Sequence, residues 1–258
     1  MIRSKLESLA YSPDNKQYQD NEYLEANNIS KTFVNSETGK ISTWIVEPES
    51  AKGTVLHFHG SGYNVSKHID HVAWLRAYGY RVVAFDYAGY GYSENLPTRK
   101  SVIDSSKSII EWVEQRFPNS PVFVFGQSLG GAIASETIHI LGKKFRGLII
   151  DSSFARYRDI AVFKLMNRGY PAQVAKILSL VLTKQHDPIE YIHEIDIPTL
   201  FLHSKDDPIV PYEQSEQLHS KSKKSTLWLQ KDRGHTDVFR PDFEDYRKRL
   251  INWMEKQL

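Results

Sequence analysis

The stretch from Pro121 to Gly131 constrains the fold more than any other part of this 258-residue chain. Val122 to Phe125 form a short run of β-branched and aromatic residues, which is typical of a strand covered on both faces. The next five residues, Gly126-Gln-Ser-Leu-Gly130, match the pattern G-x-S-x-G, in which a strained turn lifts a serine hydroxyl clear of a sheet. Glycines at both ends let the strand and the following helix cross closely. The stretch therefore predicts a buried strand, a sharp turn at Ser128 and a helix that reaches about Leu141.

Strand-like and helical segments alternate along most of the chain. Apolar runs of strand length cover residues 29–34, 41–46, 54–58, 81–85, 122–125, 146–151, 198–203 and 225–230. Segments with helical apolar spacing cover residues 67–78, 98–117, 128–141, 212–220 and 243–256. This alternation predicts an α/β fold with a mostly parallel central sheet, helices on both faces, right-handed crossovers and an antiparallel hairpin formed by the first two runs.

The same pattern suggests how the chain is divided. Residues 1–28 are polar and weakly periodic, so we expect a surface arm that is either a short helix or extended. Residues 29–258 account for one domain. Within it the alternation pauses at about 152–197, where basic residues surround an apolar helical stretch from Ala172 to Leu182. We interpret this segment as an insertion that folds over the site as a lid of helices.

Composition excludes several classes of protein. The 33 lysines and arginines against 31 acidic residues leave a net charge of +2, which gives no reason to expect a nucleic-acid partner. Because the chain has no cysteine, it cannot form disulfides, use a thiolate or bind a metal through sulfur. The first ten residues lack the apolar core of a signal peptide, and no stretch reaches the ~20 apolar residues of a membrane span. We expect a soluble protein of the cytoplasm or periplasm, although a leader or anchor that Met1 replaced would leave no trace.

Candidate catalytic residues follow the predicted strands. In a parallel sheet the carboxyl ends of the strands meet at one rim, and Ser128, Asp207 and His235 all lie just past such ends. A serine hydroxyl needs a base to accept its proton and a carboxylate to orient that base. His235, preceded by a glycine in the last loop, is the best base. The acid is Asp206 or Asp207, and we prefer Asp207 because the Pro-Ile-Val-Pro stretch after it would anchor its loop.

Acyl transfer also needs hydrogen-bond donors for the negative charge that develops on the substrate oxygen, each worth ~3 kcal/mol. The backbone amide of Leu129 directly follows the serine and is one candidate. The second belongs to the loop after the strand of residues 54–58, where Ser61 is preferred and Gly62 is the alternative. His59 in the same loop is better explained as a structural residue that bonds the loop.

Five segments together resemble the α/β-hydrolase superfamily. They are His59-Gly-Ser-Gly-Tyr-Asn64, Asp86-Tyr-Ala-Gly-Tyr-Gly-Tyr-Ser93, Gly126-Gln-Ser-Leu-Gly-Gly131, Asp207-Pro-Ile-Val-Pro211 and Gly234-His235. Within the superfamily, the chain is similar to the small serine hydrolases that include depalmitoylase-like and Bem46-like proteins. The resemblance implies hydrolysis of an ester or thioester through an acyl-enzyme, with Ser128, Asp207 and His235 as the triad and no metal or organic cofactor. The loop reads His-Gly-Ser-Gly-Tyr-Asn where that group has His-Gly-Asn-Ala-x-Asn, which leaves the second donor and the acyl preference open.

Other interpretations remain. The same triad could cleave amides, as in a peptidase, or the scaffold could bind a ligand without turning it over. His68 and His71, with Asp70 between them, could share a helix face and hold a metal, but surface histidines are the simpler interpretation. The apolar residues of the insertion suggest an acyl chain as the group held, although core packing is the more usual explanation of such a stripe: Val174, Ile177, Leu178, Leu180, Val181 and Leu182. The basic residues there could meet an acidic substrate or a membrane surface, although solvated surface charge is the simpler interpretation.

Overall fold

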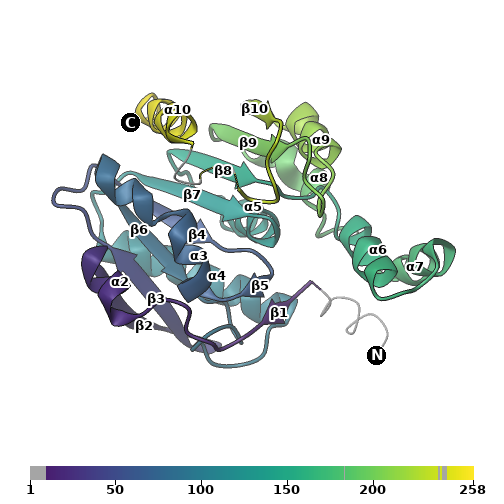
Figure 1. Cartoon of the computed structure of the whole chain (residues 1–258), viewed down its shortest axis with the longest axis horizontal. Coiled ribbons are helices and arrows are strands. Elements are labelled where there is room, and N and C mark those ends of the chain that lie inside the picture. Colours follow the sequence, from purple (N-terminus) through teal and green to yellow (C-terminus); the bar gives the residue numbers. More distant parts are fainter. Residues whose placement is uncertain (1–9, 183, 238, 240–242) are drawn as a thin grey trace.

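The computed structural model describes residues 10–182, 184–237, 239 and 243–258 and is built around an eight-stranded sheet (Figure 1). The strand order is β10-β9-β8-β7-β4-β6-β3-β2. The bounds of these strands are β2 Ile29–Ser36, β3 Gly39–Val46, β4 Gly53–Phe58, β6 Tyr80–Phe85, β7 Val122–Gln127, β8 Gly147–Asp151, β9 Thr199–Ser204 and β10 Ser225–Gln230.

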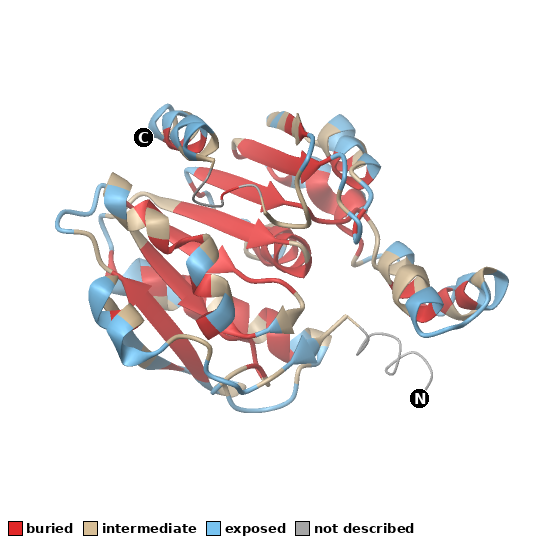
Figure 2. Ribbon diagram, in the orientation of Figure 1, coloured by how far each residue is buried: buried red, intermediate tan, exposed pale blue. Residues whose placement is uncertain are grey.

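The strand pairing is parallel from β10 to β6 and antiparallel at the other edge. There β2 pairs with β3, and β3 pairs with β6, in antiparallel register. All residues of β4 and of β9 are buried, as continuous apolar runs require when a sheet is covered on both faces (Figure 2). The sequence-based prediction of a mostly parallel sheet with an antiparallel N-terminal hairpin is therefore confirmed.

Helices cover the two faces of the sheet and enclose two layers of core. One apolar cluster joins the sheet to α4, α5, α8 and α9, and the other joins it to the short helices after β4 and to α10. The bounds on the first face are α4 Arg99–Arg116, α5 Leu129–Leu141, α8 Pro188–Tyr191 and α9 Glu213–Lys221. On the second face lie α3 Val65–His68, η1 Ile69–His71, η2 Ala73–Tyr78 and α10 Glu244–Glu255. Among the described residues, no helix is both long enough and apolar enough to cross a bilayer.

The helix expected over residues 67–78 is broken into three short pieces, which is a correction. Val72 adopts a φ of −131°, which interrupts the helix between η1 and η2. The apolar spacing survives the break, because Ile69, Val72 and Leu75 all stay fully buried. Gly79 ends the segment with a φ of +80°, as the sequence predicts for a helix cap.

The N-terminal arm contains both of the conformations that the sequence allowed. Its extended part, β1 (Ser12–Pro13), pairs in parallel with β5 (Gly62–Tyr63), and its helical part is α2 (Asn21–Ala26). The Asn64 side-chain amide donates to the Asp14 carboxylate at 2.6 Å and to the Lys16 carbonyl at 2.8 Å. These bonds fasten the arm to the loop between β4 and α3.

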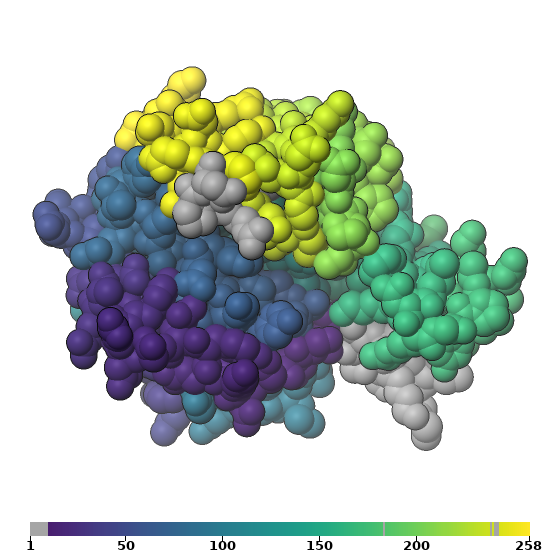
Figure 3. Space-filling view, viewed as in Figure 1, coloured from purple at the N-terminus to yellow at the C-terminus, as the bar shows by residue number. Residues whose placement is uncertain are grey.

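Only part of the expected helical insertion stands apart from the main body. α6 (Tyr157–Asn167) and α7 (Ala172–Ser179) form a hairpin that projects at one side of the molecule (Figure 3). By contrast, α8 and η3 (Ile192–Glu194) pack into the main core, where Ile189 and Ile192 are buried. The segment from 152 to 197 is therefore not one lid. Its second half completes the body of the domain.

Candidate active site

Ser128 occupies a strained turn between β7 and α5. Its φ of 53° and ψ of −120° lie in a region that residues other than glycine rarely adopt. The turn is over-determined by its surroundings, because the Ser128 N–H donates to the Asp151 carbonyl at 2.8 Å and the Ser128 carbonyl accepts from Gly131 N–H at 3.0 Å. Strain of this kind persists only where it is held by such contacts, and it is common at functional sites.

Two glycines make the turn possible by allowing close backbone contact. A Cβ on Gly126 would lie 2.6 Å from the carbonyl oxygen of Gly130. A Cβ on Gly130 would collide with the backbone carbonyl of Phe58 at the end of β4. The predicted crossing of strand and helix is confirmed for Gly126, whereas Gly130 makes room for the neighbouring strand β4.

Asp207 and His235 lie together at the same edge of the sheet. The Asp207 carboxylate is fully buried, and its Oδ2 is 2.6 Å from Nδ1 of His235. Its Oδ1 accepts from the backbone amides of Ile209 at 2.8 Å and Val210 at 3.0 Å. The loop after the aspartate thus holds the carboxylate, as we expected from the Pro-Ile-Val-Pro stretch.

The neighbours of Asp207 keep it ionised. Burial alone would raise the pKa of its carboxyl, but hydrogen bonds from His203 and His235 outweigh burial and hold the pKa well below the ordinary value. Nδ1 of His235 must therefore carry the proton of this bond, because a carboxylate only accepts. That tautomer leaves Nε2 of the imidazole unprotonated and able to act as a base.

Asp206, the alternative acid, lies elsewhere. Its side chain is exposed, and its Oδ2 accepts from the backbone amide of Asp232 at 2.6 Å. It braces the loop before His235 and does not contact the imidazole among the hydrogen bonds of the described residues.

Ser128 and His235 share the rim without being joined by a hydrogen bond. In the part of the chain that the structure describes, no bond links the serine hydroxyl to the imidazole, and catalytic hydrogen bonds often tighten only when substrate is bound. The two loops are connected indirectly. The Thr236 amide donates to the Ser152 hydroxyl at 3.3 Å, and Ser152 follows Asp151, whose carbonyl accepts from the Ser128 amide.

The two expected oxyanion donors border the same small cavity as the serine. Ser61, Ser128 and Leu129 line a cavity of about 30 Å³. The Ser61 carbonyl accepts from the Ser12 amide and from the Tyr90 hydroxyl, each at 2.9 Å, so the loop backbone is anchored. Within the described residues, the Ser61 and Leu129 N–H groups donate to no protein acceptor, which leaves both amides available to a substrate oxygen.

A buried polar network supports the turn from below and was not foreseen from the sequence. Oε1 of Gln127 lies 3.1 Å from Nε2 of His57 and 3.0 Å from Nδ1 of His71, while its Nε2 donates to Asp151 at 2.9 Å. Because the amide oxygen only accepts, both histidines donate to it. His203 is a second missed residue, although its position four residues before Asp207 at a strand end was a usable signal.

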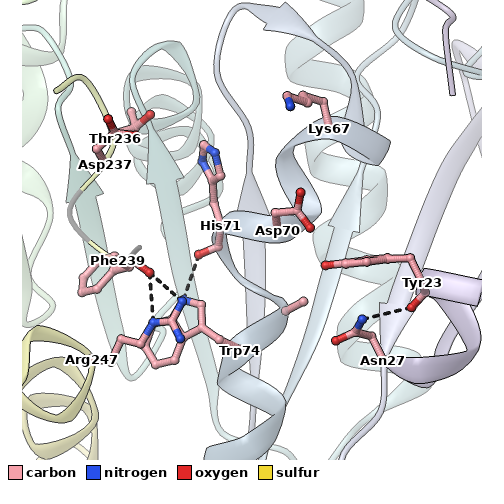
Figure 4. A pocket seen from close by; sticks show the side chains of 11 residues that line it. Tyr23, Asn27, Lys67, Asp70, His71, Trp74, Thr236, Asp237, Phe239 and Arg247 are labelled. Atoms are coloured by element: carbon pink, nitrogen blue, oxygen red, sulfur yellow. Dashed lines mark hydrogen bonds between the residues drawn. The ribbon is translucent and has the colours of Figure 1, made fainter. Parts of the chain in front are cut away.

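A larger polar pocket adjoins the network, with a volume of about 530 Å³ (Figure 4). It lies between α2, the α3–η2 segment and the loop after His235, and its polar lining includes Lys67, Asp70, His71, Thr236, Asp237 and Arg247. His71 and His68 are half-buried and hydrogen-bonded to Gln127 and to the Gly62 carbonyl, so their interpretation as surface histidines was wrong. Within the described residues, no three histidine or carboxylate side chains converge as a metal site.

The insertion contributes α6, not α7, to the serine cavity. Ile160, Phe163 and Lys164 of α6 line the cavity together with Phe154. The apolar residues that suggested a groove for an acyl chain lie mostly on the outside: Val174, Ile177, Leu180 and Val181 are exposed. Core packing therefore does not account for these four side chains, and the acyl group that they suggested stays a prediction.

The chain is similar to several known proteins. The family described as "Serine aminopeptidase, S33" matches residues 49–188, and a second pattern, described as BD-FAE, matches residues 172–222. The uncharacterized protein YfhR of Escherichia coli (strain K12) is 30% identical over 258 residues, which cover 95% of this chain and 85% of YfhR. The lysophosphatidylserine lipase ABHD12 of Macaca fascicularis is 29% identical over 195 residues, covering 70% of this chain and 48% of that protein.

Solved structures show the same fold. The Pyrococcus furiosus esterase Pf2001 superposes with a TM-score of 0.77 at 19% identity, covering 96% of this chain and 97% of the esterase. The esterase EaEST of Exiguobacterium antarcticum gives a TM-score of 0.66 at 21% identity, covering 88% and 100%. The family match spans more than half of the chain and includes Ser128. The chain therefore belongs to the serine aminopeptidase S33 family of the α/β-hydrolase superfamily.

Proposed function

We propose that this protein is a serine hydrolase that cleaves carboxylic esters or thioesters. Ser128 is the nucleophile, His235 the base and Asp207 the acid that orients the base. The observation that carries the proposal is the 2.6 Å bond between the buried Asp207 carboxylate and His235, on the edge that holds the strained Ser128. The esterase and lipase names of similar proteins support the same class of reaction.

The reaction follows from the positions of these groups. Nε2 of His235 takes the proton of the Ser128 hydroxyl as its oxygen attacks the acyl carbon, and the Asp207 carboxylate stabilises the imidazolium. The N–H groups of Ser61 and Leu129 bind the oxygen that becomes negative, each worth ~3 kcal/mol of barrier. The imidazolium then gives its proton to the leaving alcohol or thiol. Water, deprotonated by the same imidazole, then attacks the acyl carbon, the bond to the Ser128 oxygen breaks, and the imidazolium returns its proton to that oxygen as the acid leaves.

The cavity beside Ser128 suits a small acyl group. Its volume of about 30 Å³ leaves little room for a long acyl chain. Phe154, Ile160 and Phe163 make its wall apolar. We therefore propose short acyl chains as the preferred group, unless α6 moves outward to enlarge the cavity.

The test combines covalent labelling with ester hydrolysis. Wild-type protein should react with a fluorophosphonate probe and hydrolyse p-nitrophenyl acetate faster than p-nitrophenyl octanoate. Ser128→Ala should lose the label and at least ~10³-fold in kcat/KM, because the remaining groups cannot supply a nucleophile. Ser220→Ala, which removes an exposed hydroxyl on α9, is the matched control and should behave as wild type. Equal labelling of the wild type and Ser128→Ala would refute the proposal.

Amide cleavage is the second candidate, because the family takes its description from a serine aminopeptidase. The same groups could protonate a leaving amine. Hydrolysis of an aminoacyl p-nitroanilide at a kcat/KM above that of p-nitrophenyl acetate would favour the peptidase. A protein that binds ligands without turnover would leave the probe unreacted.

A further inference from the structure

The hairpin of α6 and α7 is an appendage with its own small core. Its interior consists of Ala161, Leu165, Ala175 and Leu182, which are buried, with Val162 and Leu178 packed against them. The two helices contact mainly each other and stand out from the body (Figures 1 and 3). We call residues 157–182 the lobe. A lobe of this size buries little apolar surface, so its outward side chains are not explained by packing.

The outer surface of the lobe is unusually apolar. Among the described residues, 13 large hydrophobic side chains are exposed, and six of them fall between residues 166 and 181. These six are Met166, Tyr170, Val174, Ile177, Leu180 and Val181. Ile177 and Leu180 are the most exposed of them, at 66% and 61%. Large exposed apolar patches on soluble domains mark surfaces that contact other molecules.

The same segment is one-sided in charge. Residues 157–182 hold four of the 33 lysines and arginines of the chain and one of its 31 acidic residues, Asp159, and Lys184 follows just beyond the lobe. Arg168, Lys176 and Lys184 are exposed, and none of the three forms an ion pair with the described residues. The remainder of the chain has slightly more acidic than basic residues. Positive charge therefore accompanies the apolar patch.

We propose that the lobe docks on an anionic lipid surface. Apolar side chains that enter the boundary between head groups and acyl chains, flanked by lysine and arginine that face lipid phosphates, are the features of helices that lie on membranes. A second copy of the chain fits less well, because pairing two lobes would bring like charges together around the patch. Each basic residue near such a surface strengthens binding about fivefold.

Docking would bring the membrane next to the site. Ile160, Phe163 and Lys164 of α6 line the cavity at Ser128, while α7 and the residues on either side of it carry most of the apolar patch. A lipid surface in contact with the lobe is thus one helix away from the proposed nucleophile. This inference concerns where the protein works and adds to the proposed ester hydrolysis.

The experiment measures flotation of the full chain with vesicles of phosphatidylcholine alone and of phosphatidylcholine with about 30% phosphatidylglycerol. Wild-type protein should float with the anionic vesicles and at least tenfold less with the neutral ones. Ile177→Ser/Leu180→Ser should lower binding to the anionic vesicles at least tenfold. Arg168→Gln/Lys176→Gln should lower it about 25-fold, from two charges at about fivefold each. Because all four side chains are exposed, these variants should keep the melting temperature of the wild type.

Matched controls replace exposed residues outside the lobe. Phe33→Ser on β2 and Lys221→Gln/Lys223→Gln at the end of α9 should leave flotation unchanged. The proposal is overturned if wild-type protein stays unbound, if the lobe variants float as well as wild type, or if the lobe variants only convert a dimer to a monomer. Hydrolysis of p-nitrophenyl acetate is measured in parallel without lipid. If the protein hydrolyses the ester but does not float with vesicles, only the docking proposal is refuted. If it floats but does not hydrolyse the ester, only the proposed function is refuted.

Discussion

Asp207 illustrates how one residue obtains its role from its surroundings. Its carboxylate receives two backbone amides on Oδ1 and faces two imidazoles on Oδ2, with His203 at 3.2 Å and His235 at 2.6 Å. A buried carboxylate is costly unless it is hydrogen-bonded, and these four donors supply the compensation. The fixed carboxylate in turn fixes the tautomer of the proposed base.

Neighbouring aspartates offer a direct test of this assignment. Asp207→Asn should lower kcat/KM for p-nitrophenyl acetate by about 10³–10⁴-fold, because an amide no longer selects the Nδ1–H tautomer or stabilises the imidazolium. Asp206→Asn is the matched control and should cost less than about tenfold, since an asparagine oxygen can still accept from the Asp232 amide. Similar losses in the two variants would contradict the role of Asp207.

Individual site residues could be predicted from the sequence where a short local pattern marked them. The G-x-S-x-G pattern marked Ser128, and the proline-flanked loop separated Asp207 from Asp206. The support of the site was not predictable in the same way. Gln127 bonds His57 and His71, which are 70 and 56 residues away, and no local pattern reports a contact between side chains so distant in sequence.

The turn from β7 into α5 shows what elements add to residues. Gly130 lies where α5 crosses the end of β4, so the backbone carbonyl of Phe58 fills the space of a side chain. Gly142 ends the same helix with a φ of 59°, but a Cβ there would meet nothing within 4 Å. Glycine is therefore required at position 130 because a side chain would not fit, and at position 142 because the backbone is left-handed.

Alanine substitutions at these two positions should differ accordingly. Gly130→Ala should lower the free energy of unfolding by about 3 kcal/mol or more, because two backbones must move apart. Gly142→Ala should cost only about 1–2 kcal/mol, the price of a left-handed conformation for an L residue. Urea unfolding of both variants measures the difference. Equal losses would mean that the crossing at Gly130 tolerates a methyl group.

Elements were easier to predict than their placement. The strands and long helices followed from apolar periodicity, because burial on one or two faces leaves a regular pattern. The insertion did not, since periodicity shows that α7 has an apolar face but not which partner covers it. In the structure Ala175 is buried against α6, so the apolar face of α7 is covered by α6 and not by the site.

Three histidines packed beneath the site couple the stability of the whole domain to pH. Burial lowers the pKa of His57 to about 3 and that of His68 to about 4, and it lowers the pKa of His59 well below the ordinary value. Above pH 6.5, the ordinary pKa of histidine, these neutral imidazoles do not lower the free energy of unfolding. As the pH falls from 6.5 toward their pKa values in the folded state, the unfolded chain takes up more protons and the free energy of unfolding decreases. Burial also raises the pKa of Asp86 to about 7, which acts with the opposite sign.

The histidines and Asp86 change the stability of the wild type in opposite directions over the same pH range. A variant is therefore needed to isolate the effect of one histidine. As the pH falls from about 6.5 to 4, the free energy of unfolding of His68→Gln should rise relative to that of the wild type by up to ~1.4 kcal/mol for each pH unit. The reason is that the variant lacks the proton that His68 takes up when the wild type unfolds. The control is His193→Gln, at a side chain that is 51% exposed and lies outside this cluster. Urea unfolding at several pH values gives both curves, and a flat curve for His68→Gln would contradict the linkage.

The pairing of β1 with β5 has a practical consequence for anyone who recombines this protein with a relative. The Ser12 amide and the Tyr90 hydroxyl jointly hold the Ser61 carbonyl, so the loop beside the serine is shaped by residues that precede the sheet. A chimera joined at residue 29, where the first strand of the sheet begins, would import a foreign arm and leave that carbonyl with a single donor. Crossovers are better placed so that the arm and the β4–α3 loop come from the same parent.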